Sequence, residues 1–356
     1  MIESGRGEKM RAGRSARYRR ANLNISAVIV IYLALFSGGA ACRATGAGPA
    51  AKQKAENSII GAYLMALHDF DFTNRTFRAD MWLWSHSSPR SKRKPLQTME
   101  FTNAQKTSAS LFTEEVKGGV RWEQCKICGT FRYHWDLRNF PFDSHNLEIH
   151  IEEGVDDVRA LTYEADAKDS THVKELRLDG WKITDFQIIS HPVVHSSTFG
   201  DPALSSGSVS KYAGLIIRIT VRRMEIMSYI KLTAVAYISF MLTLLSFFLH
   251  MDGGEGFSDS RMTLLAGALF ATVMNMSAAS SALGTWDTMT LVDKVHIVTL
   301  LHILFAAFLA VLARVLLSKG VSVRRLRKMD LRAEALATIT FIGTNGYMVI
   351  RAARAG

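Results

Sequence analysis

Three long runs of apolar residues in the last part of the chain constrain its fold more than any other feature. The runs 229–250 and 262–283 carry a single charged residue between them, Lys231. The third run is uncharged over 295–313 and extends to about 292–317. A helix needs about 20 residues to cross the hydrocarbon core of a bilayer. Each run therefore predicts a membrane-spanning helix.

A fourth apolar run, ALATITFIGTNGYMVI at 335–350, is marginal for a membrane span. It has only 16 residues, and these include two glycines and an asparagine. Such a helix would depend on protein neighbours to satisfy its polar groups. We expect it to form a fourth span at about 335–352, which completes a four-helix transmembrane bundle over 224–356.

The N-terminal segment has the parts of a secretory signal peptide. Seven Lys/Arg within residues 1–20 precede the 12-residue apolar stretch ISAVIVIYLALF, and small residues follow it. Because this stretch is short for a span, cleavage near 41–47 is favoured over an uncleaved anchor, which remains the alternative. We assign 1–44 to a signal peptide and 45–58 to a linker, so the chain that follows is exported.

Residues 59–223 have the pattern of a β-rich domain. Short segments such as TFRADMWLWSH and HNLEIHIEE alternate apolar and polar residues, and clusters of Gly, Asn, Asp, Ser and Pro separate them. Alternation with period two predicts half-buried strands. We expect an extracellular antiparallel β-sandwich.

The net charge of +11 is explained by where Lys and Arg lie. Besides the N-terminal cluster, six basic residues crowd between the third and fourth apolar runs: Lys319, Arg324, Arg325, Arg327, Lys328 and Arg332. Cytoplasmic loops are enriched in Lys and Arg, and four spans after an exported domain put this loop in the cytoplasm. We therefore predict a membrane partner and no nucleic-acid partner.

The cysteines and histidines give no pattern of a metal site. After the signal peptide only Cys125 and Cys128 remain, whereas a structural zinc site needs four ligands. We expect two unrelated thiols, because residues i and i+3 of a strand point to opposite faces. A strained disulfide is the alternative. His296 and His302 do not share a helix face, so each is expected to be a hydrogen-bonded histidine between helices.

No nucleophile–base pair or metal-ligand constellation stands out along the chain. We therefore expect no enzyme, no catalytic residues and no cofactor.

The second apolar run carries a stripe on one helical face that is polar or small at both ends and bulky and apolar in the middle. Its members follow spacings of 4, 3, 4, 3 and 4: Thr263, Gly267, Phe270, Met274, Ser277 and Ser281. A polar stripe inside a membrane must face protein or water. One interpretation is a packing face between helices. The other is the lining of a pore to which several symmetric subunits each contribute a copy.

In the pore interpretation, Asp259 forms a carboxylate ring at the cytoplasmic mouth, and such rings favour cations. Phe270 and Met274 form an apolar constriction that closes by expelling water. Arg261 would weaken the preference for cations if it faced the lumen.

The stretch FRYHWDLRNFPFDSHNLEIHIE at 131–152 places a proline between two phenylalanines and an aspartate directly after them. Further features are the pair Arg222-Arg223 before the first apolar run, the stripe of the second run, and TMTLVDKVHIVTLLHILF at 288–305. Together these features resemble the pentameric ligand-gated ion channels, the Cys-loop receptor superfamily. The resemblance covers about residues 59–353.

Two features depart from many members of that family. The disulfide that brackets the FPFD loop in animal members is absent, since Tyr133 and Leu147 stand at the bracketing positions. In this the chain resembles the bacterial branch. The first span also lacks the proline that many relatives carry there.

The resemblance implies a homopentameric channel, multi-pass in a bacterial inner membrane, with its sandwich in the periplasm. A small-molecule or ion ligand would open a central pore. The residues that would couple the sandwich to the helices are Phe140, Pro141, Phe142 and Asp143, with Arg222 or Arg223 as the partner of Asp143. The turn 73–75 and the link 284–294 would complete this junction. A non-conducting ligand sensor of the same fold is the alternative.

The resemblance also implies that the ligand binds between neighbouring sandwiches, beneath the hairpin 190–213. The candidate ligand-binding residues are Trp82, Trp84, Phe101, Glu153, Phe199 and Tyr212, with Glu152, Asp156 and Asp157 nearby. Trp82 and Trp84 could offer a cation–π surface or belong to the sandwich core. No feature of the sequence identifies the agonist.

Overall fold

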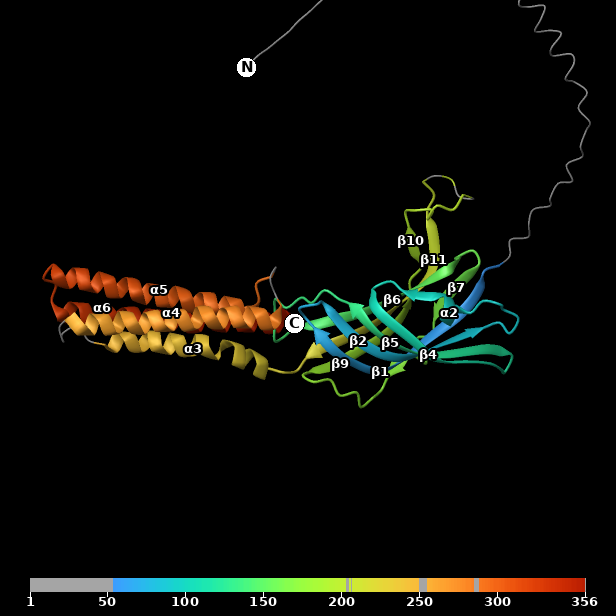
Figure 1. Ribbon diagram of the computed structural model, residues 1–356. Helices are drawn as coiled ribbons and strands as arrows, with labels where there is room; N and C mark the ends of the chain where they lie inside the picture. Colours follow the sequence, from blue (N-terminus) through green and yellow to red (C-terminus); the bar gives the residue numbers. More distant parts are fainter. Residues whose placement is uncertain (1–53, 203–204, 206, 250–254, 285–287, 356) are drawn as a thin grey trace, which may run out of the picture. The chain divides into compact units, whose positions relative to one another are not determined.

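The computed structural model describes residues 54–202, 205, 207–249, 255–284 and 288–355. The predicted signal peptide and residues 45–53 of the predicted linker lie outside the described residues. The described chain is β-rich up to residue 223 and helical after it (Figure 1).

Two β-sheets form the first part. One has the order β4-β5-β2-β1-β7 with β8 also paired to β1, and the other has the order β10-β11-β6-β3 with β9 paired to β11. Most neighbours are antiparallel, but β7 and β8 pair with β1 in parallel, because the chain returns to this edge from β6 in the other sheet. The prediction of a purely antiparallel sandwich is therefore wrong at this edge.

The strands are β1 (Glu56–Asp71), β2 (Thr76–Ser87), β3 (Met99–Phe101), β4 (Ala104–Lys117), β5 (Val120–Arg132), β6 (Ser144–Asp157), β7 (Leu161–Ala165), β8 (Thr171–His172), β9 (Trp181–Ser190), β10 (Val193–His195) and β11 (Ser210–Arg223). A short helix, α2 (Pro95–Thr98), lies between β2 and β3. Strand β1 starts three residues before the predicted domain boundary at 59.

Alternation along β2 shows how the sequence builds the core between the sheets. The residues of one face are buried: Phe77, Ala79, Met81 and Leu83. Trp82 and Trp84 point to the opposite face and are half-buried. Of the two alternatives for these tryptophans, the sandwich core is therefore wrong, because their positions in the strand are out of phase with the buried ones.

The two described cysteines are free thiols, which confirms the first interpretation of their spacing. Cys125 is buried on the core side of β5, and Cys128 is half-buried on the other side. Burial raises the pKa of Cys125 to about 11, so this thiol is protonated and unreactive near neutral pH.

Four long helices follow: α3 (Met227–Phe248), α4 (Glu255–Leu283), α5 (Leu291–Ser318) and α6 (Val323–Ala355). Helices α3 and α5, and α4 from Asp259 onward, are long and apolar enough to cross a membrane, which agrees with the first three predicted spans. Helix α6 is not among these candidates, because glycines, threonines and an asparagine dilute its apolar residues. The fourth span stays a prediction.

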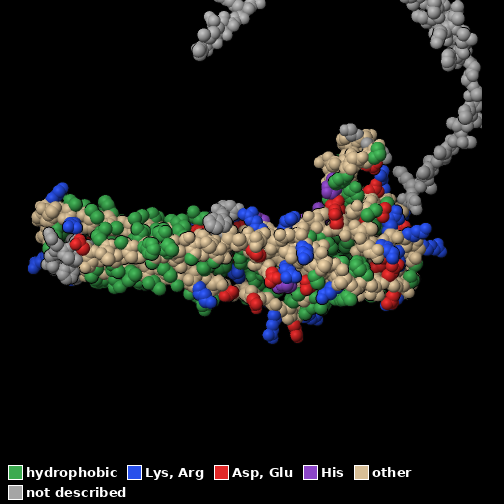
Figure 2. All heavy atoms as spheres, viewed as in Figure 1, with side chains coloured by type: hydrophobic (Ala, Val, Ile, Leu, Met, Phe, Trp, Pro, Cys, Tyr) green, Lys and Arg blue, Asp and Glu red, His purple; other side chains and the backbone are tan. Residues whose placement is uncertain are grey.

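Helices α3, α4 and α5 pack on one another, and α6 lies along α5 and contacts α3 (Figure 1). Phe247, Leu265 and Ile303 belong to their shared apolar core. The ring of Phe341 in α6 stacks on Phe240 in α3, with 3.6 Å between the ring centroids. Figure 2 shows hydrophobic side chains spread over the outside of the helices, as a lipid-facing surface requires.

Candidate functional site

The FPFD loop is a tight turn between β5 and β6. The amide of Phe140 donates to the carbonyl of Leu137 over 3.1 Å, and the amide of Phe142 donates to that of Asn139 over 2.8 Å. The Phe140–Pro141 peptide bond is cis. Phe140 and Pro141 are buried and Phe142 is half-buried, so the loop anchors itself in the end of the sandwich.

Asp143 and Arg223 form a buried, two-pronged ion pair at this end. Arg223 donates through Nε to Asp143 Oδ1 over 2.8 Å and through an Nη2 hydrogen to Oδ2 over 3.0 Å. The amide of Arg223 also donates to the Asp143 carbonyl over 3.1 Å. The sequence left Arg222 and Arg223 open as partners. The structure selects Arg223, while Arg222 is exposed.

Aromatic rings enclose the Arg223 guanidinium. Its central carbon lies 4.0 Å from the ring centroid of Trp181, 4.7 Å from that of Phe140 and 5.3 Å from that of Phe72. Stacked and bidentate contacts are the ones that arginine makes better than lysine. The sequence analysis missed Trp181 and Phe72, which reach the site from β9 and from the turn after β1.

His145 is a third member of the ion-pair site that the sequence analysis missed. Its Nε2 lies 2.8 Å from Asp143 Oδ2, and its side chain is buried. The alternation in D-S-H signals this contact, because residues i and i+2 of a strand share a face.

The pKa of Asp143 reflects two opposing effects. Burial raises it, but the hydrogen bonds from His145 and Arg223 and the charge of Arg223 together hold it below the ordinary value of 3.8. A carboxyl group with a lowered pKa in the folded state stabilises that state only while it is ionised. The stabilisation is therefore complete above pH 3.8 and is lost as the pH falls through the lower, folded-state pKa.

We expect Asp143→Asn to lower the thermal unfolding midpoint by the same amount at about pH 7 and about pH 5, and by a smaller amount near pH 3. Tryptophan fluorescence of the full-length protein in detergent measures each midpoint. A difference that had already vanished at about pH 5 would contradict a lowered pKa.

The β1–β2 turn meets the end of α4 at Gly284. This glycine has a φ of +61°, and a Cβ atom on it would lie 2.7 Å from Thr73 Oγ1 and 2.8 Å from Thr73 Cα. Leu283 and Val292 belong to the same apolar cluster as the sandwich core. Both predicted parts of the junction, the turn 73–75 and the link 284–294, thus come to this place, although residues 285–287 lie outside the described residues.

The first turn of α5 is fixed to the end of α4. The Thr290 hydroxyl accepts from the Asp293 amide over 3.2 Å, and the Asp293 carboxylate accepts from the Thr290 amide over 2.9 Å. This reciprocal pair is a capping box. The other oxygen of Asp293 accepts from the Ser280 hydroxyl in α4 over 3.3 Å.

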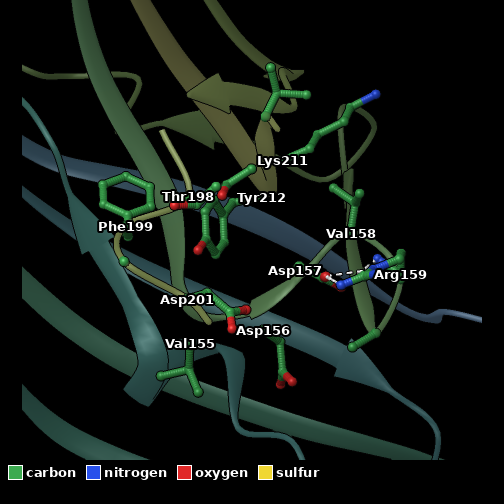
Figure 3. Close-up of a pocket in the computed structure, with 14 residues that line it drawn as sticks. Val155, Asp156, Asp157, Val158, Arg159, Thr198, Phe199, Asp201, Lys211 and Tyr212 are labelled. Atoms are coloured by element: carbon green, nitrogen blue, oxygen red, sulfur yellow. Dashed lines mark hydrogen bonds and ion pairs between the residues drawn. The ribbon is translucent and has the colours of Figure 1, made fainter. Parts of the chain in front are cut away.

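The hairpin formed by β10 and β11 encloses a cavity of about 600 Å³ with the segment 155–160, which includes the end of β6 (Figure 3). The predicted ligand residues Phe199 and Tyr212 meet here, with 6.1 Å between their ring centroids. His195 lies 5.1 Å from the ring of Phe199 and 6.0 Å from that of Tyr212. Its Nε2 lies 2.6 Å from Oε1 of the buried Glu152.

Charged side chains of both signs line the same cavity. Asp156, Asp157 and Asp201 face it, together with Lys211 and Arg159, whose Nε donates to Asp157 over 2.7 Å (Figure 3). The arrangement can accept a ligand that combines an ionic group with an apolar or aromatic part. No sequence signal singled out Asp201, Lys211 and Arg159 in the lining, or His195 beside Phe199 and Tyr212.

The other four candidate ligand residues lie elsewhere in the sandwich. Phe101 packs on Phe131 of the core. Glu153 is buried and accepts from the hydroxyls of Thr98 and Tyr163. Trp84 donates to Asp166 over 3.0 Å and, with Trp82, lies on the outward face of β2. Within one chain, therefore, only Phe199 and Tyr212 come together.

The stripe on α4 is exposed along its whole described length. All six of its members have exposed positions, and Phe270 is 67% exposed and Met274 is 55% exposed. Leu265, Ala268 and Ala279 lie on the opposite, buried side. No helix of the same chain covers the stripe among the described residues, so within one chain it is not a packing face.

Arg261 does not belong to this exposed face. It is buried, and its Nη1 donates to Asp330 Oδ2 in α6 over 3.1 Å. Its guanidinium carbon lies 4.8 Å from the ring centroid of Phe247. Asp259 is exposed and lies 3.6 Å from Arg314, which is exposed too. Arg261 thus turns away from the stripe, whereas Asp259 stays exposed just before it.

The two histidines of α5 are hydrogen-bonded between helices, as predicted. Nε2 of His296 lies 2.8 Å from Nδ2 of Asn275 in α4, and its Nδ1 lies 2.8 Å from the Val292 carbonyl. Nε2 of His302 lies 3.0 Å from the Thr340 hydroxyl in α6. Among the described residues, no group of three His, Cys, Asp or Glu side chains is placed to hold a metal ion.

Comparison with known proteins adds no assignment to this geometry. No protein-family model matches the chain, and no curated protein matches it significantly.

Proposed function

We propose that this chain is a subunit of a ligand-gated, cation-selective ion channel with the architecture of the pentameric ligand-gated channels. The observation that carries the proposal is the uncovered stripe on α4. It is polar or small at both ends and bulky in the middle, and it faces away from the other helices of its own chain. Polar groups inside a membrane need protein or water beside them.

One helix cannot enclose a pore, so copies of α4 must surround an axis. Closed rotational symmetry gives every copy the same environment, and we propose five copies. Phe270 and Met274 then form an apolar constriction, and Thr263 and Ser281 lie near the two mouths. Wetting and drying of the constriction would open and close the pore.

The proposed mechanism is a population shift. A small-molecule or ion ligand occupies the cavity beneath the β10–β11 hairpin. The neighbouring subunit completes this binding site and would present Trp82 and Trp84 to it. Binding favours one arrangement of the sandwiches. The Asp143–Arg223 site and the contact of Thr73 with Gly284 transmit this arrangement to the end of α4.

We also propose that α6 is a fourth span and that the sandwich lies outside an inner membrane. Leu336, Ile339, Ile342 and Ile350 of α6 are each more than half exposed, which suits contact with lipid. The exposed basic residues at the start of α6 would then face the cytoplasm. The proposal includes no enzymatic activity and no cofactor.

The test is current through planar bilayers that contain the purified protein, combined with cysteine accessibility on α4. With Cys42, Cys125 and Cys128 replaced by alanine, single cysteines at positions 263, 267 and 277 should react with an aqueous thiol reagent. Matched cysteines at the buried positions 268 and 279 should not. Equal reactivity on both sides of α4 would contradict the pore. A pentamer that never conducts, even as Phe270→Ala, would instead support a non-conducting sensor.

Cation selectivity is a separate expectation. Replacing Asp259 with asparagine removes the proposed carboxylate ring, so the reversal potential in a cation gradient should move toward zero. Arg314→Gln, which removes the exposed neighbour 3.6 Å away, should leave the reversal potential at the cation value. An unchanged reversal potential in Asp259→Asn would remove this residue from its role.

A further inference from the structure

A second cavity, of about 520 Å³, lies where the loop before β6 meets the ends of two helices. Arg138 lines it from the loop, Leu291 and Lys294 from the first turns of α5, and Tyr347, Met348 and Arg351 from the last turns of α6. It is separate from the cavity beneath the hairpin, because the two share no residue.

The charge of this cavity has one sign. Three basic side chains line it, and no carboxylate of the described residues does. Arg138 is held by Asp136, with Nε–O distances of 2.8 and 3.1 Å. Lys294 and Arg351 have no ion-pair partner among the described residues. The nearest acid in sequence, Asp293, is buried and accepts from the Thr290 amide and hydroxyl. An anion in the cavity would therefore meet two cations that no protein carboxylate neutralises.

The remaining lining is largely apolar. Leu291 is buried, Met348 is half-buried and Tyr347 is 63% exposed. From here a line of exposed apolar side chains, Ile350, Ile342 and Ile339, follows the outside of α6 away from its end. A small inorganic anion would use the basic half of the cavity only, whereas an amphiphile with an anionic head would use both halves.

In the proposed four-span arrangement, this cavity would lie at the level of the lipid head groups. Lys294 stands one helical turn inside the start of α5, and Arg351 one turn before the end of α6. Basic side chains near helix ends extend toward the membrane interface. Each Lys or Arg close to an anionic membrane surface strengthens the attraction about fivefold.

We propose that this cavity binds the anionic head group of a membrane phospholipid, with the acyl chains along the exposed face of α6. The phosphate lies between Lys294 and Arg351, and Arg138 closes the site from the sandwich side. Because Arg138 is two residues before Phe140, an occupied site restrains the FPFD loop from outside. The proposal rests on α6 crossing the membrane and does not require that the protein conducts ions.

The test measures binding of spin-labelled phosphatidylglycerol to the full-length protein in phosphatidylcholine vesicles. The motionally restricted fraction of the label reports bound lipid. We expect Lys294→Gln/Arg351→Gln to weaken binding about thirtyfold, since two cationic contacts are lost. The charge-preserving variant Lys294→Arg/Arg351→Lys should keep binding near the wild-type level.

Two controls distinguish this site from general attraction between charges. Arg324→Gln/Arg325→Gln removes two exposed cations at the other end of α6 and should leave binding unchanged. Unlabelled phosphatidylglycerol should displace the label, and glycerol phosphate without acyl chains should not.

Three outcomes would overturn the proposal. The first is an equal loss of lipid binding in the two double glutamine variants. The second is full displacement of the labelled lipid by glycerol phosphate. The third is unchanged binding in Lys294→Gln/Arg351→Gln. If the glutamine variant fails to fold, the charge-preserving variant provides the test. Loss of lipid binding in that variant, which keeps both cations, would contradict the proposal.

Discussion

Replacing Arg223 with methionine should lower the thermal unfolding midpoint of the full-length protein by about 10 °C. The substitution leaves Asp143 buried, with His145 as its one remaining side-chain partner among the described residues. Removing one partner of a buried ion pair costs about 3–5 kcal/mol. For a domain of this size each kcal/mol shifts the midpoint by about 2–4 °C.

Arg222 provides the matched control, because it is the same residue type one position earlier on the same strand. It is exposed and takes no part in the Asp143 site. Arg222→Met should therefore shift the midpoint by about 1 °C or less. The fluorescence of Trp181 and Trp135, which lie 6.1 Å apart next to the site, reports the transition. Equal shifts in the two variants would contradict the assignment of Arg223 as the buried partner.

A second substitution of Arg223 separates the effect of its charge from the effect of its geometry. Arg223→Lys keeps the charge but loses the two-pronged geometry and the stacking on Trp181. Its midpoint should lie between those of the wild type and Arg223→Met. If the lysine variant were as stable as the wild type, charge alone would account for the site.

Replacing Asp330 with alanine should release α6 from α4. The substitution leaves the Arg261 guanidinium buried among helices without a counter-charge. A charge without a partner inside a membrane protein is strongly unfavourable, and breaking a buried pair costs about 3–5 kcal/mol. We expect lower yield of the assembled protein by size-exclusion chromatography and faster tryptic cleavage at the basic start of α6.

Two further variants separate the lost pair from other effects. Among the described residues, Arg261 Nε and Nη2 and Asp330 Oδ1 have no hydrogen-bond partner, so the pair is electrostatically incomplete. Replacing both residues by apolar ones, Arg261→Met/Asp330→Leu, should therefore recover most of the loss. Glu334→Ala removes an acid one turn later on α6 and should behave as the wild type. No recovery in the double variant would show that the pair is not what holds α6.

Much of the fold could be predicted from local pattern. Period-two alternation identified the strands, and apolar runs of about 20 residues identified the first three candidate spans. The edge pairing of β7 and β8 with β1 was not predictable, because parallel pairing depends on where a long connection returns the chain. The tryptophans of β2 were left open, because alternation gives two faces without saying which one meets the second sheet.

The candidate site was predictable in part. FPFD and the arginine pair stood out in the sequence, but the choice between Arg222 and Arg223 required the register of β6 against β11, which pairs Arg222 with Ser144 and brings Arg223 back to Asp143. His195 was not singled out, since one histidine in the hairpin segment 190–213 has no distinctive pattern. It gains its neighbours Phe199 and Tyr212 only when the hairpin folds.

The sequence by itself determined that a β-rich domain precedes apolar helices, and that one of those helices carries a polar stripe. These features follow from the periodicity and length of segments, which are local properties of the chain. Only the tertiary structure decided that the stripe is uncovered, that Arg261 turns inward to Asp330, and that three cations surround one cavity. The reason is physical: burial, pairing and the sign of the charge in a cavity depend on side chains that are distant in sequence and meet only when the elements pack.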